Sequence, residues 1–134
     1  MTAADARTAN RQLIEAYAGE LSNGDLEAAS AYWSDVVVMT VPGHNPYAGV
    51  FTGPEQVGAA IVAMRQALDE PPEADVFELL CGEEHVAALV SETARRNGRD
   101  LTFRRVVVYG VAAGEISSIT VFHEDEYAVD EFFS

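Results

Sequence analysis

The sequence predicts a single α+β domain in which helices come first and a curved, mainly antiparallel sheet comes last. Apolar residues recur every three to four positions in the first part of the chain, and β-branched runs dominate the second part. No repeat or low-complexity linker separates the two parts. A chain of 134 residues can build one hydrophobic core, so we assign residues 1–134 to one domain.

Two helices are predicted to open the chain. Over residues 5–22 the apolar side chains fall on one stripe of a helix, which Gly24 ends. Asn23 or Asp25 can cap a second helix. We expect its inner face to carry Leu26, Ala29 and Trp33.

A strand is predicted at residues 35–41, because this run is β-branched and too short for a globular helix. Pro42 and Gly43 end it, and residues 50–52 can form a short strand or hairpin arm. The third helix is predicted to begin at Thr52-Gly53-Pro54-Glu55, which places a proline and an acid in the first turn. Pro71-Pro72 closes this helical segment.

The rest of the chain is predicted to form four strands, at residues 75–81, 85–94, 101–111 and 115–123. Short turns separate these apolar runs, and the Asn97-Gly98 pair is typical of a hairpin. Long strands twist and curl when one face wraps around helices. We therefore expect a cone with a closed end, an open mouth and one internal pocket.

The predicted strands are apolar on both faces, which bears on assembly. Val36 and Val38 alternate with Val37 and Met39, and the run around Val106 to Val108 has the same character. A half-exposed sheet should have polar residues on one side. We predict that a second copy of the chain covers the outer face in a homodimer. The alternative is that a helix or the C-terminal segment covers it within one chain.

The charge balance argues against several classes of partner. The chain has 22 acidic and 8 basic side chains and a net charge of −14. Such a surface repels nucleic acid and anionic membranes, so neither is an expected partner. The N-terminus lacks the apolar stretch of a signal peptide, and Cys81 is the only cysteine, so a cytoplasmic location is expected. No metal-ligand spacing and no dinucleotide or phosphate-binding glycine motif occurs, so we expect no metal and no cofactor.

Several stretches of the chain resemble known proteins. Residues 14–19, with Asn23-Gly24-Asp25-Leu26 and Trp33-Ser34-Asp35, resemble the opening of ketosteroid isomerases. Residues 42–49 resemble a loop of SnoaL-like proteins, and residues 127–132 resemble their C-terminal tail. The chain is thus similar to the SnoaL-like and ketosteroid isomerase-like members of the nuclear transport factor 2-like superfamily over roughly residues 5–133. The resemblance implies a cone-shaped fold in which three N-terminal-side helices pack into the curved sheet.

The resemblance also indicates which catalytic groups differ. Ketosteroid isomerases use a carboxylate base together with an oxyanion hole made by a tyrosine and a protonated aspartic acid. Tyr17 falls on the tyrosine position, but Val41 falls on the base position and Val106 or Val107 on the acid position. The usual isomerase machinery is therefore not expected. Because Tyr17 lies on the inner stripe of a helix, it can also be an ordinary core residue.

Histidines and one arginine remain as polar candidates for chemistry. His44 lies in the loop after the first strand, and His123 ends the last strand before two acids, whereas His85 is expected at an exposed turn. We predict His44, His123 and Tyr17 as catalytic residues. The parity that turns Tyr109 inward also turns Arg105 inward, where its guanidinium must meet an acid or a ligand. The predicted substrate-binding residues are Trp33, Met39, Val41, Tyr47, Arg105, Val107 and Tyr109.

Two functions fit these features. The first is a small, cofactor-independent enzyme, a polyketide cyclase or isomerase-like protein, that acts on a hydrophobic metabolite bearing a carbonyl or hydroxyl group. The second is a non-catalytic module of the same fold that binds a small ligand or dimerises. The absent carboxylate base favours the binding module, and the polar set of Tyr17, Arg105 and Tyr109 favours the enzyme.

Overall fold

The computed structural model describes residues 2–134. In it, the first two helices form where the capping residues predict them. Helix α1 (Ala3–Ser22) begins with a capping box in which the Thr2 and Asp5 side chains each accept from the other's backbone N–H. Asp25 caps α2 (Leu26–Ser30) by accepting from the backbone N–H of Ala28. Helix α2 is shorter than predicted, so Trp33 does not belong to it. Trp33 is instead the first residue of a strand, because the helix ends three residues earlier.

Helix α3 (Gly53–Gln66) begins at the predicted proline signal, with Pro54 in its first turn. It follows the short strand β2 (Gly49–Thr52), which pairs with the end of the first strand. Val57 and Ile61 form its buried face. The third helix therefore lies against the sheet as predicted.

One six-stranded sheet in the order β2-β1-β6-β5-β4-β3 makes up the rest of the fold. Besides β2, it contains β1 (Trp33–Val41), β3 (Glu73–Cys81), β4 (His85–Arg96), β5 (Arg99–Ala112) and β6 (Glu115–His123). All neighbouring strands are antiparallel except β1 and β6. The β4–β5 turn places Asn97 and Gly98 at positive φ, as a two-residue hairpin requires.

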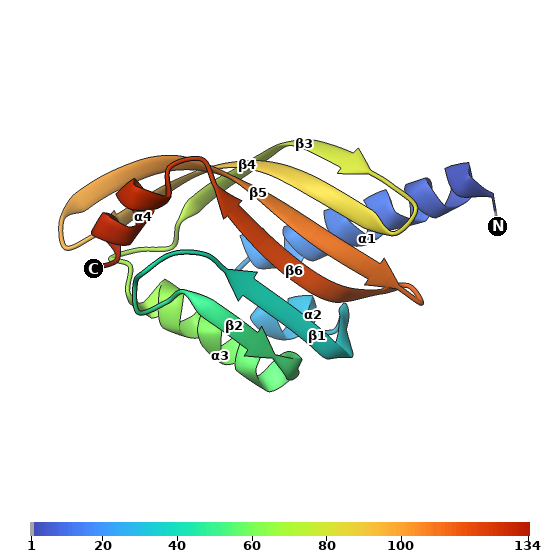
Figure 1. Ribbon diagram of the computed structural model, residues 1–134, viewed down its shortest axis with the longest axis horizontal. Coiled ribbons are helices and arrows are strands. Elements are labelled where there is room, and N and C mark those ends of the chain that lie inside the picture. The colour runs from blue at the N-terminus through green and yellow to red at the C-terminus, as the bar shows by residue number, and fades with distance from the viewer. Residues whose placement is uncertain (1) are drawn as a thin grey trace.

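The sheet curls around the helices, and its inner face forms most of the core. In Figure 1 the strands β4 and β5 pass in front of α1, and β1 passes in front of α2, so these helices lie on one side of the sheet. Pairing in register aligns an apolar inner row across all six strands. From β2 to β3 this row is Phe51, Met39, Ile119, Tyr109, Val86 and Cys81.

A fourth helix lies at the C-terminus, where the resemblance implies a tail. Asp125 caps α4 (Glu126–Phe132), and Val129, Phe132 and Phe133 are buried against Phe103 and neighbouring residues. Figure 1 shows α4 beside the β4–β5 hairpin, at one end of the sheet. The helix therefore closes that end and leaves the middle of the outer face uncovered by any described helix.

The outer face of the sheet carries several exposed apolar side chains. Phe77, Leu80 and Phe122 are each more than half exposed there. The register places a second row on this face, which is apolar at four of its six positions and reads, from β2 to β3, Val50, Thr40, Thr120, Val108, Ala87 and Leu80. No helix within residues 2–134 is long and apolar enough to cross a membrane.

Candidate functional site

A large cavity lies between the inner face of the sheet and the helices α1 and α3. Its volume is about 1040 Å³, which is large enough for a ligand with several rings. Eight of the ten predicted site residues line it: Tyr17, Met39, Val41, Tyr47, Arg105, Val107, Tyr109 and His123. The cone is therefore open rather than filled by side chains.

Three polar side chains stand together in the wall of this cavity. Arg105 on β5 pairs in register with His123 on β6 and with Val90 on β4, so these side chains share the inner face. Glu92 lies two residues beyond Val90 and points to the same face. Nη2 of Arg105 donates a hydrogen bond of 2.9 Å to Oε1 of Glu92. The side chains of Glu92 and Arg105 are 6% and 21% exposed, so this is a largely buried ion pair.

Two buried nitrogen atoms in this group lack a hydrogen-bond partner within residues 2–134. They are Nε of Arg105 and Nδ1 of His123. Buried polar atoms in proteins are nearly always satisfied, so two such atoms on adjacent side chains require an explanation. Both belong to residues that line the cavity. The two atoms themselves are buried, so it is the other exposed atoms of Arg105 and His123 that a ligand in the cavity can contact.

The surroundings of His123 favour its neutral form. Burial lowers the pKa of His123, the positive charge of Arg105 lowers it further, and Asp130 opposes both effects. The ring of Phe103 packs edge-on against the imidazole at 5.8 Å. A neutral imidazole that faces an apolar cavity can accept a proton near neutral pH.

Two tyrosines form the aromatic part of the wall. The rings of Tyr17 and Tyr109 meet edge to face at 5.7 Å. Burial raises the pKa of both hydroxyls above the usual range for tyrosine, so both stay protonated. The Tyr17 hydroxyl accepts a 3.2 Å hydrogen bond from Nε1 of Trp33, which leaves its own proton free to donate.

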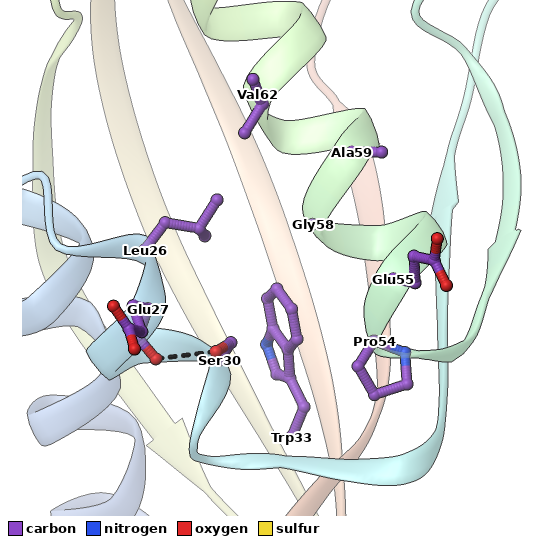
Figure 2. A pocket seen from close by; sticks show the side chains of 9 residues that line it. All are labelled: Leu26, Glu27, Ser30, Trp33, Pro54, Glu55, Gly58, Ala59 and Val62. Atoms are coloured by element: carbon purple, nitrogen blue, oxygen red, sulfur yellow. Dashed lines mark hydrogen bonds between the residues drawn. The ribbon is translucent and has the colours of Figure 1, made fainter.

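Trp33 does not line the large cavity, contrary to the prediction. It borders a separate hollow of about 440 Å³ between α2 and α3 (Figure 2). In Figure 2 the side chain of Glu55 points away from the indole. Because Trp33 begins β1 rather than continuing α2, its ring lies behind Tyr17 and supports it.

The buried position of Trp33 gives a direct test of this arrangement. Its side chain is 4% exposed, so we expect blue-shifted fluorescence that iodide quenches far less than in the unfolded chain. Trp33 is the only tryptophan, so the signal needs no correction. A Tyr17→Phe variant removes the acceptor for the indole N–H and should alter the emission without exposing the ring. Emission like that of tryptophan in water would contradict the placement.

His44 also lies outside the cavity, so the structure does not support its predicted catalytic role. Its side chain is 94% exposed. The loop is held by hydrogen bonds to Asp130 instead. The backbone N–H of His44 and the side-chain amide of Asn45 both donate to Oδ1 of Asp130, at 2.9 and 2.8 Å. The hydrogen bond from Asn45 lowers the pKa of Asp130, and the backbone N–H of His44 adds to this. This loop therefore fixes α4, and Asn45 rather than His44 reaches the cavity.

The main residue that sequence reasoning missed is Glu92. A signal for it exists, because Val86, Ala88 and Val90 alternate inward along β4 and Glu92 continues that parity. Glu92 is itself the acid that an inward Arg105 requires. Further lining residues that were not predicted are Met64, Arg65, Phe103, Ile119 and Val121. Within residues 2–134 no group of three or more metal-binding side chains occurs.

Comparison with known proteins places this chain in a family. Residues 13–119 match the SnoaL-like domain. The uncharacterized protein Rv0034 of Mycobacterium tuberculosis is 27% identical over 127 residues, which cover 94% of this chain and 97% of that protein.

Two solved structures share the fold. Bal32a, from a soil-derived mobile gene cassette, superposes with a TM-score of 0.91 at 20% identity, over 96% of this chain and 99% of Bal32a. A nuclear transport factor 2-like protein of unknown function from Burkholderia pseudomallei K96243 superposes with a TM-score of 0.86 at 22% identity, over 94% of this chain and 98% of that one. These likenesses establish the cone-shaped, nuclear transport factor 2-like fold.

Proposed function

Because the chain belongs to the SnoaL-like domain family, we propose that it is a small enzyme of the polyketide-cyclase or isomerase type. Its substrate would be a hydrophobic metabolite that bears a carbonyl or hydroxyl group. The observation that carries this proposal is the group of Arg105, Glu92 and His123 in the wall of an otherwise largely apolar cavity. The reaction proposed needs only the protein's own side chains.

In the proposed mechanism Arg105 binds the carbonyl oxygen and His123 moves the proton. The neutral imidazole removes a proton from the carbon next to the carbonyl, and the electron pair of that C–H bond passes to the carbonyl oxygen. The guanidinium stabilises the enolate oxygen that results. Return of the proton to another carbon gives isomerisation. Attack of the enolate on a second carbonyl of the same molecule, with proton transfer to the new alkoxide, gives cyclisation.

Hydrogen–deuterium exchange tests the first step without knowledge of the natural substrate. Neutral aromatic ketones are first screened for a rise in melting temperature. The ketones that bind are then incubated with the protein in deuterated buffer near neutral pD. We expect enzyme-dependent loss of the protons next to the carbonyl, measured by proton NMR. Tight binding without any exchange above the buffer rate would contradict the enzymatic proposal.

The second candidate function is a module that binds the same ligands without turnover. Val41 favours it, because this apolar residue lines the cavity where the related isomerases carry a carboxylate base. Glu92 does not replace that base, because Arg105 already binds its carboxylate. The exchange experiment separates the two functions, because a binding module would show the rise in melting temperature without any enzyme-dependent exchange of protons.

We further propose that the protein is a homodimer formed through the outer face of the sheet. Val108 lies near the centre of this face, in the row from Val50 to Leu80. The exposed side chains of Phe77, Leu80 and Phe122 extend the apolar surface to either side. A second copy has the same apolar surface, so twofold pairing would bury both at once.

A further inference from the structure

We infer that Glu92 makes the cavity selective for uncharged carbonyl compounds over carboxylates of the same shape. The inference deepens the proposed function, because it rests on Arg105 as the group that binds the ligand oxygen. It assigns to Glu92 a role in specificity rather than in proton transfer.

The first argument is the charge balance at the binding point. The carboxylate of Glu92 lies 2.9 Å from Nη2 of Arg105 and is 94% buried, so one buried negative charge already neutralises the guanidinium. An uncharged carbonyl oxygen can still accept from the remaining N–H groups, since a guanidinium carries five. A ligand carboxylate there would place a second negative charge beside Glu92 in a poorly solvated site. Its desolvation would not be compensated by a free cation.

The second argument is the remaining charge around the cavity. Four exposed acids line its outer part, Asp69 and Glu70 in the connection after α3, and Glu73 and Asp75 at the start of β3. Arg65 is the only other arginine among the lining residues, and its guanidinium bonds to the backbone oxygen of Leu21. With a net charge of −14 over the chain, the field at the opening repels anions before they reach Arg105.

The third argument is that the polar groups of the wall near Arg105, other than the arginines, carry no positive charge. The hydroxyls of Tyr17 and Tyr109 are protonated and neutral. The imidazole of His123 favours its neutral form. These groups can hydrogen-bond an uncharged oxygen, but none supplies the counter-ion that a buried carboxylate needs.

A pair of matched probes tests the inference by binding alone. The ketone 2-acetylnaphthalene and the carboxylate 2-naphthoate share one ring system and differ in charge. Dissociation constants are measured by isothermal titration calorimetry near neutral pH. For the wild-type protein we expect the ketone to bind at least about tenfold more tightly than the carboxylate. Equal or tighter binding of 2-naphthoate, or no binding of the ketone up to its solubility limit, would overturn the inference.

The Glu92→Gln variant tests the residue assigned. It keeps the side-chain shape and removes the charge, so we expect 2-naphthoate to bind at least about tenfold more tightly than to wild type, with the ketone changed less than about threefold. Glu73→Gln removes the same charge from the exposed outer part and serves as the matched control, with less than about a threefold gain for 2-naphthoate. An unchanged preference in Glu92→Gln would overturn the role of Glu92.

A further variant keeps the test decisive. If Glu92→Gln does not fold, the double variant Glu92→Gln, Arg105→Gln removes both charges of the pair, and we expect it to lose the tighter ketone binding of wild type. Retention of the full preference by the folded double variant would overturn the inference. The preference is measured without turnover, so a protein that selects ketones but catalyses no proton exchange would refute the proposed enzyme and leave this inference standing.

Discussion

Replacement of His123 by Gln is expected to reduce turnover of a carbonyl substrate by about 10²–10⁴-fold, the usual contribution of a general base. The substitution keeps a polar side chain of similar length but removes the group that accepts the proton. Binding should change little, because Arg105 and the apolar wall remain in place. Steady-state kinetics, or the rate of proton exchange in a bound ketone, measures the effect. The matched control is His85→Gln, since His85 is exposed at the start of β4.

The pH profile of the wild-type enzyme gives a second readout of the same prediction. The base must be neutral, so kcat/KM should rise with pH through the pKa of His123 and then level off. Burial and Arg105 lower that pKa, so the midpoint should lie below the ordinary value of about 6.5. In Arg105→Gln the positive charge is gone, so the midpoint of the remaining activity should move upward. Full activity of His123→Gln across the pH range would rule out His123 as the base.

The fold could be predicted from the sequence because its signals are local and agree with one another. The proline at the start of α3, the Asn97-Gly98 turn and the β-branched runs each specify one element. The position of Trp33 could not be predicted in this way. An apolar residue four positions after Ala29 fits a helix as well as a strand, and tertiary pairing of β1 with β6 decides between them. Helix α4 has only seven residues, too few for a clear periodic signal.

The site was less predictable because it depends on contacts between strands. Alternation along β5 predicts an inward Arg105, but only the register of β4, β5 and β6 brings Glu92 and His123 beside it. His44 illustrates the opposite error. Its place in the loop after β1 suggested the mouth of the cone, whereas hydrogen bonds from that loop to Asp130 turn the His44 side chain to solvent. Such a contact across 86 residues leaves no local pattern in the sequence.

Replacement of Val108 by Asp is expected to convert the proposed dimer into monomers. Val108 lies in the middle of the outer apolar row, where a twofold interface would bury it against the partner copy. An unpaired carboxylate buried there costs roughly 3 kcal/mol, and the symmetry introduces two of them per dimer. The dissociation constant should therefore rise by at least about 10³-fold. Val38→Asp, on the same face of β1, should act in the same direction.

Light scattering coupled to size-exclusion chromatography at micromolar concentration measures this change. The matched control is Val62→Asp, since Val62 is a partly exposed valine on α3, away from the outer face of the sheet. This variant should remain a dimer, because it adds the same charge at a place that the proposed interface does not reach. Circular dichroism of all three variants separates dissociation from unfolding. A wild-type mass of one chain, 14.4 kDa, would refute the dimer, and would leave the exposed Phe77, Leu80 and Phe122 to be covered by a different partner.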